Sequence, residues 1–199
     1  MDAFNYPAEQ HVRRHGPQGY AGAESFRPWL RDEFSFRCVY CLLREMWGLV
    51  PGVFGVDHFL AVVSHPGRTL SYDNLLYCCT TCNGAKGKRR LPNPEKVLIA
   101  SEVQVNEDGT IEGKTRAARC LIRVLGLNDS EYIEFRMVWL DIVALARERD
   151  PKLYARLMGF PADLPNLASL RPPKANTRPQ GVEECYFAQR HRGSLPATY

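Results

Sequence analysis

Long hydrophobic runs are missing from this chain, and their absence excludes a helix that crosses a membrane. No apolar stretch approaches the ~18 residues that such a span requires. The first residues also lack a charged start followed by an apolar stretch, so no secretory signal is expected. We therefore expect a cytoplasmic protein without membrane contact, in which thiols stay reduced.

A strong excess of one charge is also missing. The formal net charge is only +4, which is too small by itself to indicate nucleic-acid binding. There is no internal repeat, which excludes a repeat architecture. With 199 residues, 45% of them hydrophobic, the chain suits one globular domain with extensions.

Four segments are expected along the chain, and composition separates them. They are a loose, polar N-terminal arm at 1–23, a core with the chemical motifs at 24–100, a hairpin and helical extension at 101–160, and an extended proline-rich tail at 161–199. The fold class that follows is α+β, with a small motif unit and helical extensions.

Local patterns predict the elements inside the core. Apolar residues at helical spacing indicate a helix at 24–35, and an apolar run at 53–56 indicates a strand that delivers the next two residues at its end. Proline, glycine and serine predict a loop at 64–73, followed by a turn and a helix over 74–86.

The extension carries its own signals. Asp108-Gly109 predicts a hairpin. Thr115 and Ser130 are suited to cap the two helices that follow, and Asp150-Pro151 starts a third short helix.

The spacing of the cysteines is the most informative pattern in the sequence. Two Cys-x-x-Cys pairs, Cys38 with Cys41 and Cys79 with Cys82, can place four thiolates at the corners of one tetrahedral zinc site. The alternatives are incidental core thiols or a redox pair, and a reduced compartment favours zinc. Because four thiolates leave no open coordination position, this zinc would be structural.

The other three cysteines are not expected to bind metal. The total of seven is odd, which fits poorly with complete disulfide pairing. Cys78 lacks the x-x spacing to Cys82 and is expected to be a buried thiol, while Cys120 and Cys185 lie on an apolar helix face and in the tail.

Between and after the cysteine pairs stand a carboxylate, an imidazole and two amides: Asp57, His58, Asn74 and Asn83. Hydrolysis of a phosphodiester needs a base, positive charge on the phosphate and help for the leaving oxygen. His58 can be the base, since imidazole titrates near neutrality. Asp57 and Asn83 offer hard oxygen atoms to a divalent cation, and the Asn74 amide can tie loop backbone and hold the imidazole.

Together these residues resemble the HNH endonuclease family, the ββα-metal or His-Me finger nucleases. The resemblance covers about residues 36–92 and rests on Asp57-His58, then Asn74, then Cys79-x-x-Cys82-Asn83. It implies a zinc-stapled ββα-metal core in which His58 is the general base and Asn74 orients it.

The resemblance also implies the cofactor and the products. Asp57 and Asn83 would hold one catalytic ion, and asparagine in the last position, where other members have histidine, favours Mg²⁺ or Mn²⁺. The expected reaction is hydrolysis of DNA to 5′-phosphate and 3′-hydroxyl ends.

A basic run follows the motif: Lys86, Lys88, Arg89 and Arg90. These residues are expected to contact phosphates, the alternative being a solvated face. Two other functions stay open: a non-catalytic zinc module that binds nucleic acid or a partner protein, and a nuclease acting on RNA. The helical extension or the tail could dock a protein partner.

Overall fold

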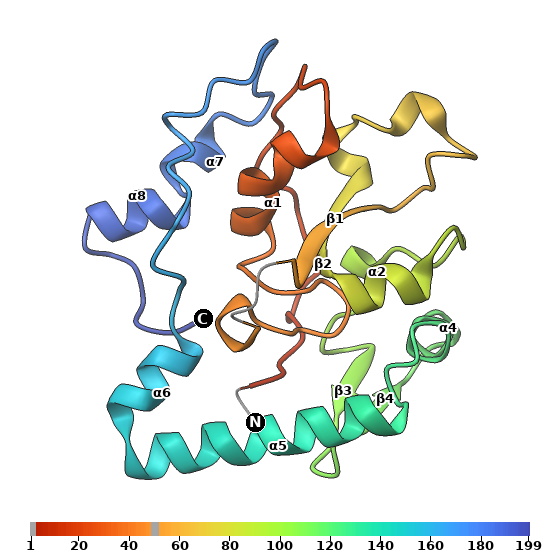
Figure 1. The fold of residues 1–199 in the computed structure, drawn as a ribbon, viewed down its shortest axis with the longest axis vertical. Helices are drawn as coiled ribbons and strands as arrows, with labels where there is room; N and C mark the ends of the chain where they lie inside the picture. Colours follow the sequence, from red (N-terminus) through yellow and green to blue (C-terminus); the bar gives the residue numbers. More distant parts are fainter. Residues whose placement is uncertain (1–2, 49–51) are drawn as a thin grey trace.

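The computed structural model describes residues 3–48 and 52–199 (Figure 1). It contains helices and two small antiparallel sheets, so the predicted α+β class is confirmed. Within the described residues, no helix has both the length and the apolar character needed to cross a membrane. Many elements contribute to one hydrophobic cluster, in which Phe26, Trp29, Leu75 and Leu121 are almost fully buried.

The motif segment forms a two-stranded sheet that runs directly into a helix. Strand β1 (Phe54–His58) pairs antiparallel with β2 (Leu75–Cys79), with His58 opposite Leu75, and α2 (Thr80–Lys86) follows at once. The predicted strand therefore continues through Asp57 and His58. The prediction of a turn and a helix over 74–86 is wrong in its first half, because Leu75–Cys79 form β2 and the helix begins at Thr80. Every residue of β2 is buried, because α1 and α2 both contact this strand.

The connection between the strands is mostly irregular, as predicted, with two short 3₁₀ turns, η3 (Pro66–Arg68) and η4 (Tyr72–Asn74). The helix expected at 24–35 is present as η1 (Ala23–Phe26) running into α1 (Arg27–Glu33). It ends two residues early, because Ser35 and Phe36 both take positive φ angles and turn the chain toward the first cysteine pair. The 3₁₀ turn η2 (Glu45–Trp47) follows that pair.

The second half builds the predicted hairpin and helices. After a short helix that was not predicted, α3 (Pro94–Val97), they are in chain order β3 (Val103–Val105), β4 (Ile111–Gly113), α4 (Arg116–Val124), α5 (Ser130–Arg149) and α6 (Pro151–Met158). Gly109 takes φ +76° in the turn of the hairpin, a conformation that favours glycine.

Two of the expected caps are present and one is not. Thr115 Oγ1 accepts a hydrogen bond from the backbone N–H of Ala118, and Asp150 caps α6. Ser130 is not a cap: Asp129 holds that position without a side-chain hydrogen bond, and Ser130 is the first residue of α5.

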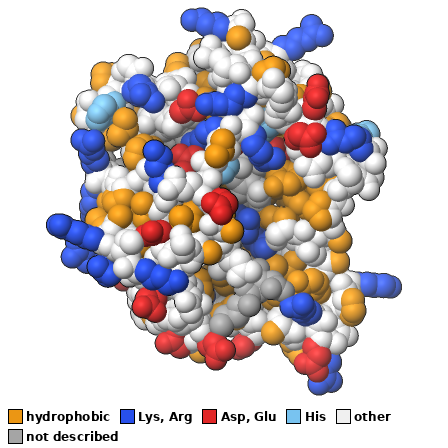
Figure 2. Space-filling view, turned by 180° about the vertical axis from the view of Figure 1, so that it is seen from behind, with side chains coloured by type: hydrophobic (Ala, Val, Ile, Leu, Met, Phe, Trp, Pro, Cys, Tyr) orange, Lys and Arg blue, Asp and Glu red, His pale blue; other side chains and the backbone are white. Residues whose placement is uncertain are grey.

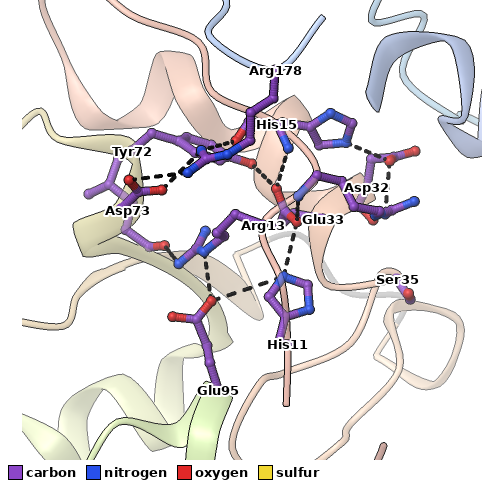
Figure 3. Close-up of polar contacts among 12 residues, drawn as sticks. His11, Arg13, His15, Asp32, Glu33, Ser35, Tyr72, Asp73, Glu95 and Arg178 are labelled. Carbon is purple, nitrogen blue, oxygen red and sulfur yellow. Dashed lines mark hydrogen bonds and ion pairs between the residues drawn. The ribbon is translucent and has the colours of Figure 1, made fainter. Parts of the chain in front are cut away.

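The prediction of a loose N-terminal arm is wrong. Ala3, Phe4, Tyr6 and His15 are buried, and the segment runs through the body of the molecule. Its basic side chains find acidic partners distant in sequence: Arg13 lies 2.6 Å from Glu95, and His15 lies 2.9 Å from Asp32 (Figure 3). A polar composition suggested disorder, but these charges are paired inside the fold.

The tail is not simply extended either. It contains α7 (Gln180–Glu183) and α8 (Tyr186–His191) and crosses back over the N-terminal segment, where Arg178 donates to the carbonyl of His15 at 2.8 Å. Its end returns to α6, with the N–H of Tyr199 donating to the carbonyl of Met158 at 3.1 Å. The tail therefore packs against both the N-terminal segment and α6.

Candidate metal centre and active site

Four cysteine sulfurs converge beside the first sheet. Cys38 and Cys41 lie in the turn before β1, Cys79 ends β2, and Cys82 lies in the first turn of α2. All four are buried, and their sulfur atoms lie within 4.8 Å of one another. The predicted grouping is confirmed, and it could hold a metal ion such as zinc.

The local backbone explains why these sulfurs meet. The N–H of Cys38 donates to the carbonyl of Leu43, and the N–H of Leu42 donates back to Cys38, so a tight turn brings the first pair together. Leu42 takes φ +61° in this turn. In the second pair, Cys79 caps α2 by accepting a hydrogen bond from the N–H of Cys82 through Sγ, at 3.4 Å.

The dimensions of the cysteine group suit a tetrahedral ion. A zinc ion with Zn–S bonds of about 2.3 Å needs S–S edges of about 3.8 Å, and the sulfurs of Cys41 and Cys79 are 3.7 Å apart. Hydrogen bonds among the four thiols lower the pKa of Cys79 and raise the pKa values of Cys41 and Cys82. A metal ion bound here would require all four sulfurs as thiolates.

The remaining cysteines stand outside this group, as the sequence predicted. Cys78 is fully buried, and burial raises the pKa of its thiol far above the usual range. It alternates with Cys79 along β2, so the two side chains point to opposite faces of the strand. Cys120 is half-buried on α4, and Cys185 is buried just before α8.

Asp57 is buried in an ion pair. Its Oδ1 accepts a hydrogen bond from Nζ of Lys86 at 2.9 Å, and its Oδ2 accepts one from the hydroxyl of Tyr40 at 2.7 Å. Lys86 also donates to the carbonyl of His58 at 2.7 Å. Strand β1 and helix α2 are thus joined by a buried charge pair at the point where the catalytic residues were expected.

The prediction that Lys86 contacts phosphate is wrong. Its side chain is only 1% exposed, so it cannot reach a ligand outside the protein. Lys86 is buried because it lies on the side of α2 that faces β1, where its ammonium contacts Asp57 and the carbonyl of His58. Lys88, Arg89 and Arg90, which follow the helix, are exposed and remain candidates for phosphate contact.

His58 has one ring nitrogen committed to the backbone. Nε2 lies 3.1 Å from the carbonyl oxygen of Thr69. A carbonyl can only accept, so Nε2 carries a proton, and in the neutral ring Nδ1 is left with its lone pair. The side chain is half-buried at the end of β1, which holds the ring while leaving part of it accessible.

Asn74 fastens the loop that supplies this carbonyl. Its Oδ1 accepts from the N–H of Leu60 at 2.8 Å, while Nδ2 donates to the carbonyls of Leu60 and Arg68, each at 3.1 Å. Since Arg68 precedes Thr69, the amide ties the start of the loop to the segment that contacts His58. The sequence predicted an amide that ties loop backbone, and the structure contains these bonds.

Asn83 lies in α2 directly after Cys82 and is half-buried, and its backbone carbonyl accepts a hydrogen bond from the N–H of Gly87 at 2.9 Å. Its amide oxygen and the Asp57 carboxylate have the hard donor chemistry that suits Mg²⁺ or Mn²⁺. A second cation on Asp57 would, however, stand beside the ammonium of Lys86. Both carboxylate oxygens of Asp57 already have partners, so a divalent ion bound there would have to displace the ammonium of Lys86.

Sequence analysis did not identify two tyrosines that contact the site residues. Tyr40 sits inside the first Cys-x-x-Cys pair, and only the fold shows that its hydroxyl meets Asp57. The hydroxyl of Tyr132 on α5 lies 3.5 Å from the sulfur of Cys82, so the extension contacts the cysteine group directly. A lone tyrosine in a helix gives no sequence signal for such a contact.

A second missed feature is a row of arginines on α4. Arg116, Arg119 and Arg123 are exposed, opposite the buried Ala118, Leu121 and Ile122. Arg89 connects this row to α2, since its guanidinium donates to the carbonyls of Ala85 and Val124. Figure 2 shows Lys and Arg side chains gathered along the edge where α2 and α4 lie. The sequence did contain a signal for this row, because the arginines follow helical spacing opposite the apolar positions of the helix.

Comparison with known proteins leaves the family undecided. A scan against protein-family models gives no match, and a search of curated proteins finds no significant relative. Function is therefore argued from the residues and their geometry.

Proposed function

We propose that this protein is a metal-dependent endonuclease of the HNH type that hydrolyses phosphodiester bonds in DNA. The observation that carries the proposal is the bond from Nε2 of His58 to the carbonyl of Thr69, at 3.1 Å. It leaves Nδ1 as a fixed acceptor on a half-buried ring, which is the state a general base requires. The neighbouring group of four cysteines supports the same assignment.

The chemistry follows from that state of the ring. Nδ1 of His58 takes a proton from a water molecule, whose oxygen attacks the phosphorus atom. The bond to the 3′ oxygen breaks as the new P–O bond forms, and the leaving oxygen takes up a proton from solvent. The products are a 5′-phosphate and a 3′-hydroxyl. Asn74 acts as a positioning residue, because it fixes the loop that orients the imidazole.

Two metal ions belong to the proposal, with different tasks. Zinc held by the four cysteines would be structural, because the sulfurs close its coordination sphere. A bound Mg²⁺ or Mn²⁺ supplies Lewis-acid polarisation of the phosphate and stabilises the leaving oxygen. Asp57 and Asn83 would hold this second ion.

The exposed cations support a polyanionic substrate. Lys88 and Arg90 follow α2, and the arginines of α4 extend the positive surface beyond the motif unit. Neutralisation of phosphates by such residues releases counterions, so binding should weaken steeply with salt. The surface contacts backbone phosphate and carries no sequence information by itself.

The test is digestion of supercoiled plasmid, and of single-stranded RNA in parallel, with Mg²⁺ or Mn²⁺ added to zinc-loaded protein. We expect cleavage of DNA by the wild-type chain and a loss of about 10²–10⁴-fold for His58→Ala. His65→Ala is the matched control, because His65 lies in the neighbouring loop and its side chain bonds only to Ser64 among the described hydrogen bonds. Equal loss in both variants would remove His58 from the mechanism, and preferential cutting of RNA would change the substrate.

A second candidate is a non-catalytic zinc module that binds nucleic acid. The buried pair of Asp57 with Lys86 favours it, since the carboxylate already has a cation as partner. This candidate predicts salt-sensitive binding with no cleavage at any concentration of Mg²⁺ or Mn²⁺. The digestion above separates the two directly.

A further inference from the structure

A cavity opens onto one edge of the cysteine group. It encloses about 250 Å³ between the first cysteine pair, the start of α2 and α5, and its walls include Cys41, Cys79 and Phe135. Cys38 and Cys82 are not part of its walls. Solvent therefore reaches the group from one side, through one cysteine of each pair.

The exposed fractions of the four cysteines agree with this arrangement. Cys41 is 5% exposed and Cys79 is 2% exposed, while Cys38 and Cys82 are completely buried. A cavity needs only about 15 Å³ of such space to hold a water molecule. Hydrogen peroxide is little larger than water, so Cys41 and Cys79 are the two members of the group that a small oxidant can reach.

The two accessible cysteines are also close enough to react with each other. Their Sγ atoms lie 3.7 Å apart, so each sulfur has the other as a neighbour for disulfide formation. Metal ligation requires deprotonated sulfur, and the thiolate is the form that peroxides oxidise. A disulfide within either Cys-x-x-Cys pair would instead need the completely buried sulfur of Cys38 or Cys82.

We propose that Cys41 and Cys79 form a site of reversible oxidation, at which a peroxide joins the two cysteine pairs by a disulfide and releases the zinc. The proposal rests on the zinc that the proposed function assigns to this group, and it does not depend on DNA cleavage. Because the cysteine group joins the turn after α1 to β2 and α2, oxidation removes a connection on which the fold relies.

The chemistry takes two displacements and one molecule of hydrogen peroxide. The thiolate of Cys41 attacks one peroxide oxygen, the O–O bond breaks, and hydroxide leaves, so that Cys41 becomes a sulfenic acid. The thiolate of Cys79 then attacks this sulfur, the S–S bond forms, and a second hydroxide leaves. Two thiolates lose two electrons, the peroxide gains them, and the zinc dissociates because two of its four ligands are gone.

The test is a titration of the full-length, zinc-loaded protein with hydrogen peroxide. A weak chromogenic chelator measures the released zinc, and mass spectrometry of tryptic peptides locates the disulfides after free thiols are blocked. Trypsin cuts after Arg44 and Arg68, so the two cysteine pairs fall in different peptides. We expect about one zinc ion for each cross-link between these peptides, with the link at Cys41 and Cys79. Dithiothreitol and added zinc should reverse both changes.

A pair of neighbouring threonines tests the route through the cavity. Thr81 lies at the cavity and is exposed, so Thr81→Phe should cover the opening and slow zinc release by about fivefold or more, since oxidation follows exposure. Thr80→Phe is the matched control, because Thr80 is also exposed at the start of α2 but does not line the cavity. It should release zinc at the wild-type rate. Circular dichroism and zinc content confirm that both variants are folded and loaded.

The outcomes separate this proposal from the proposed function. Zinc that leaves with disulfides inside the pairs, Cys38 with Cys41 and Cys79 with Cys82, overturns the proposal, and so does equal slowing in the two threonine variants. A chain that holds no zinc before oxidation contradicts the zinc assignment itself, and the oxidation site falls with it. Cross-linking as expected in a protein that does not cut DNA supports the oxidation site and leaves only the nuclease assignment refuted.

Discussion

The Asp57 carboxylate has a different partner from the one its sequence position suggests. Asp57 precedes His58, which resembles a metal-binding pattern, yet the fold gives it the ammonium of Lys86 and the hydroxyl of Tyr40. Lys86 appeared in the sequence as one cation of a basic run, and helical geometry turns it inward while its neighbours remain exposed. Spacing along the chain predicts which residues share a motif, but only packing decides which of them stay accessible.

Removing one partner of this ion pair should destabilise the protein. For Lys86→Met we expect a loss of about 3–5 kcal/mol in the free energy of unfolding, because the Asp57 carboxylate is left buried without its cation. The measurement is urea denaturation of the zinc-loaded protein. Asp57→Asn combined with Lys86→Met should cost less than the sum of the single changes. Strict additivity would show that the two side chains do not interact.

Asn74 illustrates what local sequence can predict. A residue at the junction of a loop and a strand, with both donor and acceptor groups, is suited to tie loop backbone, and its three hydrogen bonds do so. If the loop positions His58, then Asn74→Ala should lower kcat by about 10–100-fold with little change in DNA affinity. A fall in affinity with kcat unchanged would assign Asn74 to binding.

At the scale of the elements, the contacts between the N-terminal segment and α1 are the hardest to predict from the sequence. Glu33 at the end of α1 accepts hydrogen bonds from Nε2 of His11, the backbone of Arg14 and His15, and the hydroxyl of Tyr72 (Figure 3). These partners lie up to 39 residues away in sequence. Hydrophobic periodicity predicted the helix itself, but no local pattern indicates that a polar arm will be held by one buried carboxylate.

This carboxylate makes the fold sensitive to acid. Burial by itself raises the pKa of Glu33, but the hydrogen bond from His11 and the charges of His15 and Arg13 outweigh burial and lower the pKa from 4.5 to about 2. The folded state thus binds fewer protons than the unfolded state between these values, and its stability falls as the pH drops through them. The shift corresponds to roughly 3 kcal/mol.

The measurement is the free energy of unfolding against pH from 6 down to 2. The wild-type chain should lose stability mainly below pH 4.5, the ordinary pKa of this group. Glu33→Gln should be less stable at pH 6 and should show a flatter profile below pH 5. Parallel profiles for the two proteins would mean that Glu33 does not cause the acid sensitivity.

At the scale of the whole molecule, the four cysteines connect parts that are otherwise distant. They join the turn after α1, the end of β2 and the start of α2, and Tyr132 brings α5 to the same point. The sequence predicted this group because the Cys-x-x-Cys spacing by itself indicates a metal site. The sequence did not predict that the C-terminal tail packs against the N-terminal segment, since the contact of Arg178 with His15 depends on the complete fold.

The metal should therefore contribute to global stability. We expect about one zinc ion per chain, and a large drop in the melting temperature when a strong chelator removes it. Cys82→Ser should reproduce the loss, while Cys120→Ser, at a cysteine outside the group, should not. Elemental analysis and thermal unfolding of the three proteins measure both effects. Identical melting curves with and without chelator would contradict a structural role.

The central claim is that the ring of His58, fixed through Nε2, removes a proton from the attacking water. Single-turnover cleavage of duplex DNA in Mg²⁺ or Mn²⁺ tests it most directly, with wild-type protein and His58→Ala matched for zinc content and melting temperature. The account predicts cleavage by the wild type to 5′-phosphate ends and a rate about 10²–10⁴-fold lower for the variant. Equal rates for the two proteins, or a wild-type chain that binds DNA without cutting it, would contradict the account.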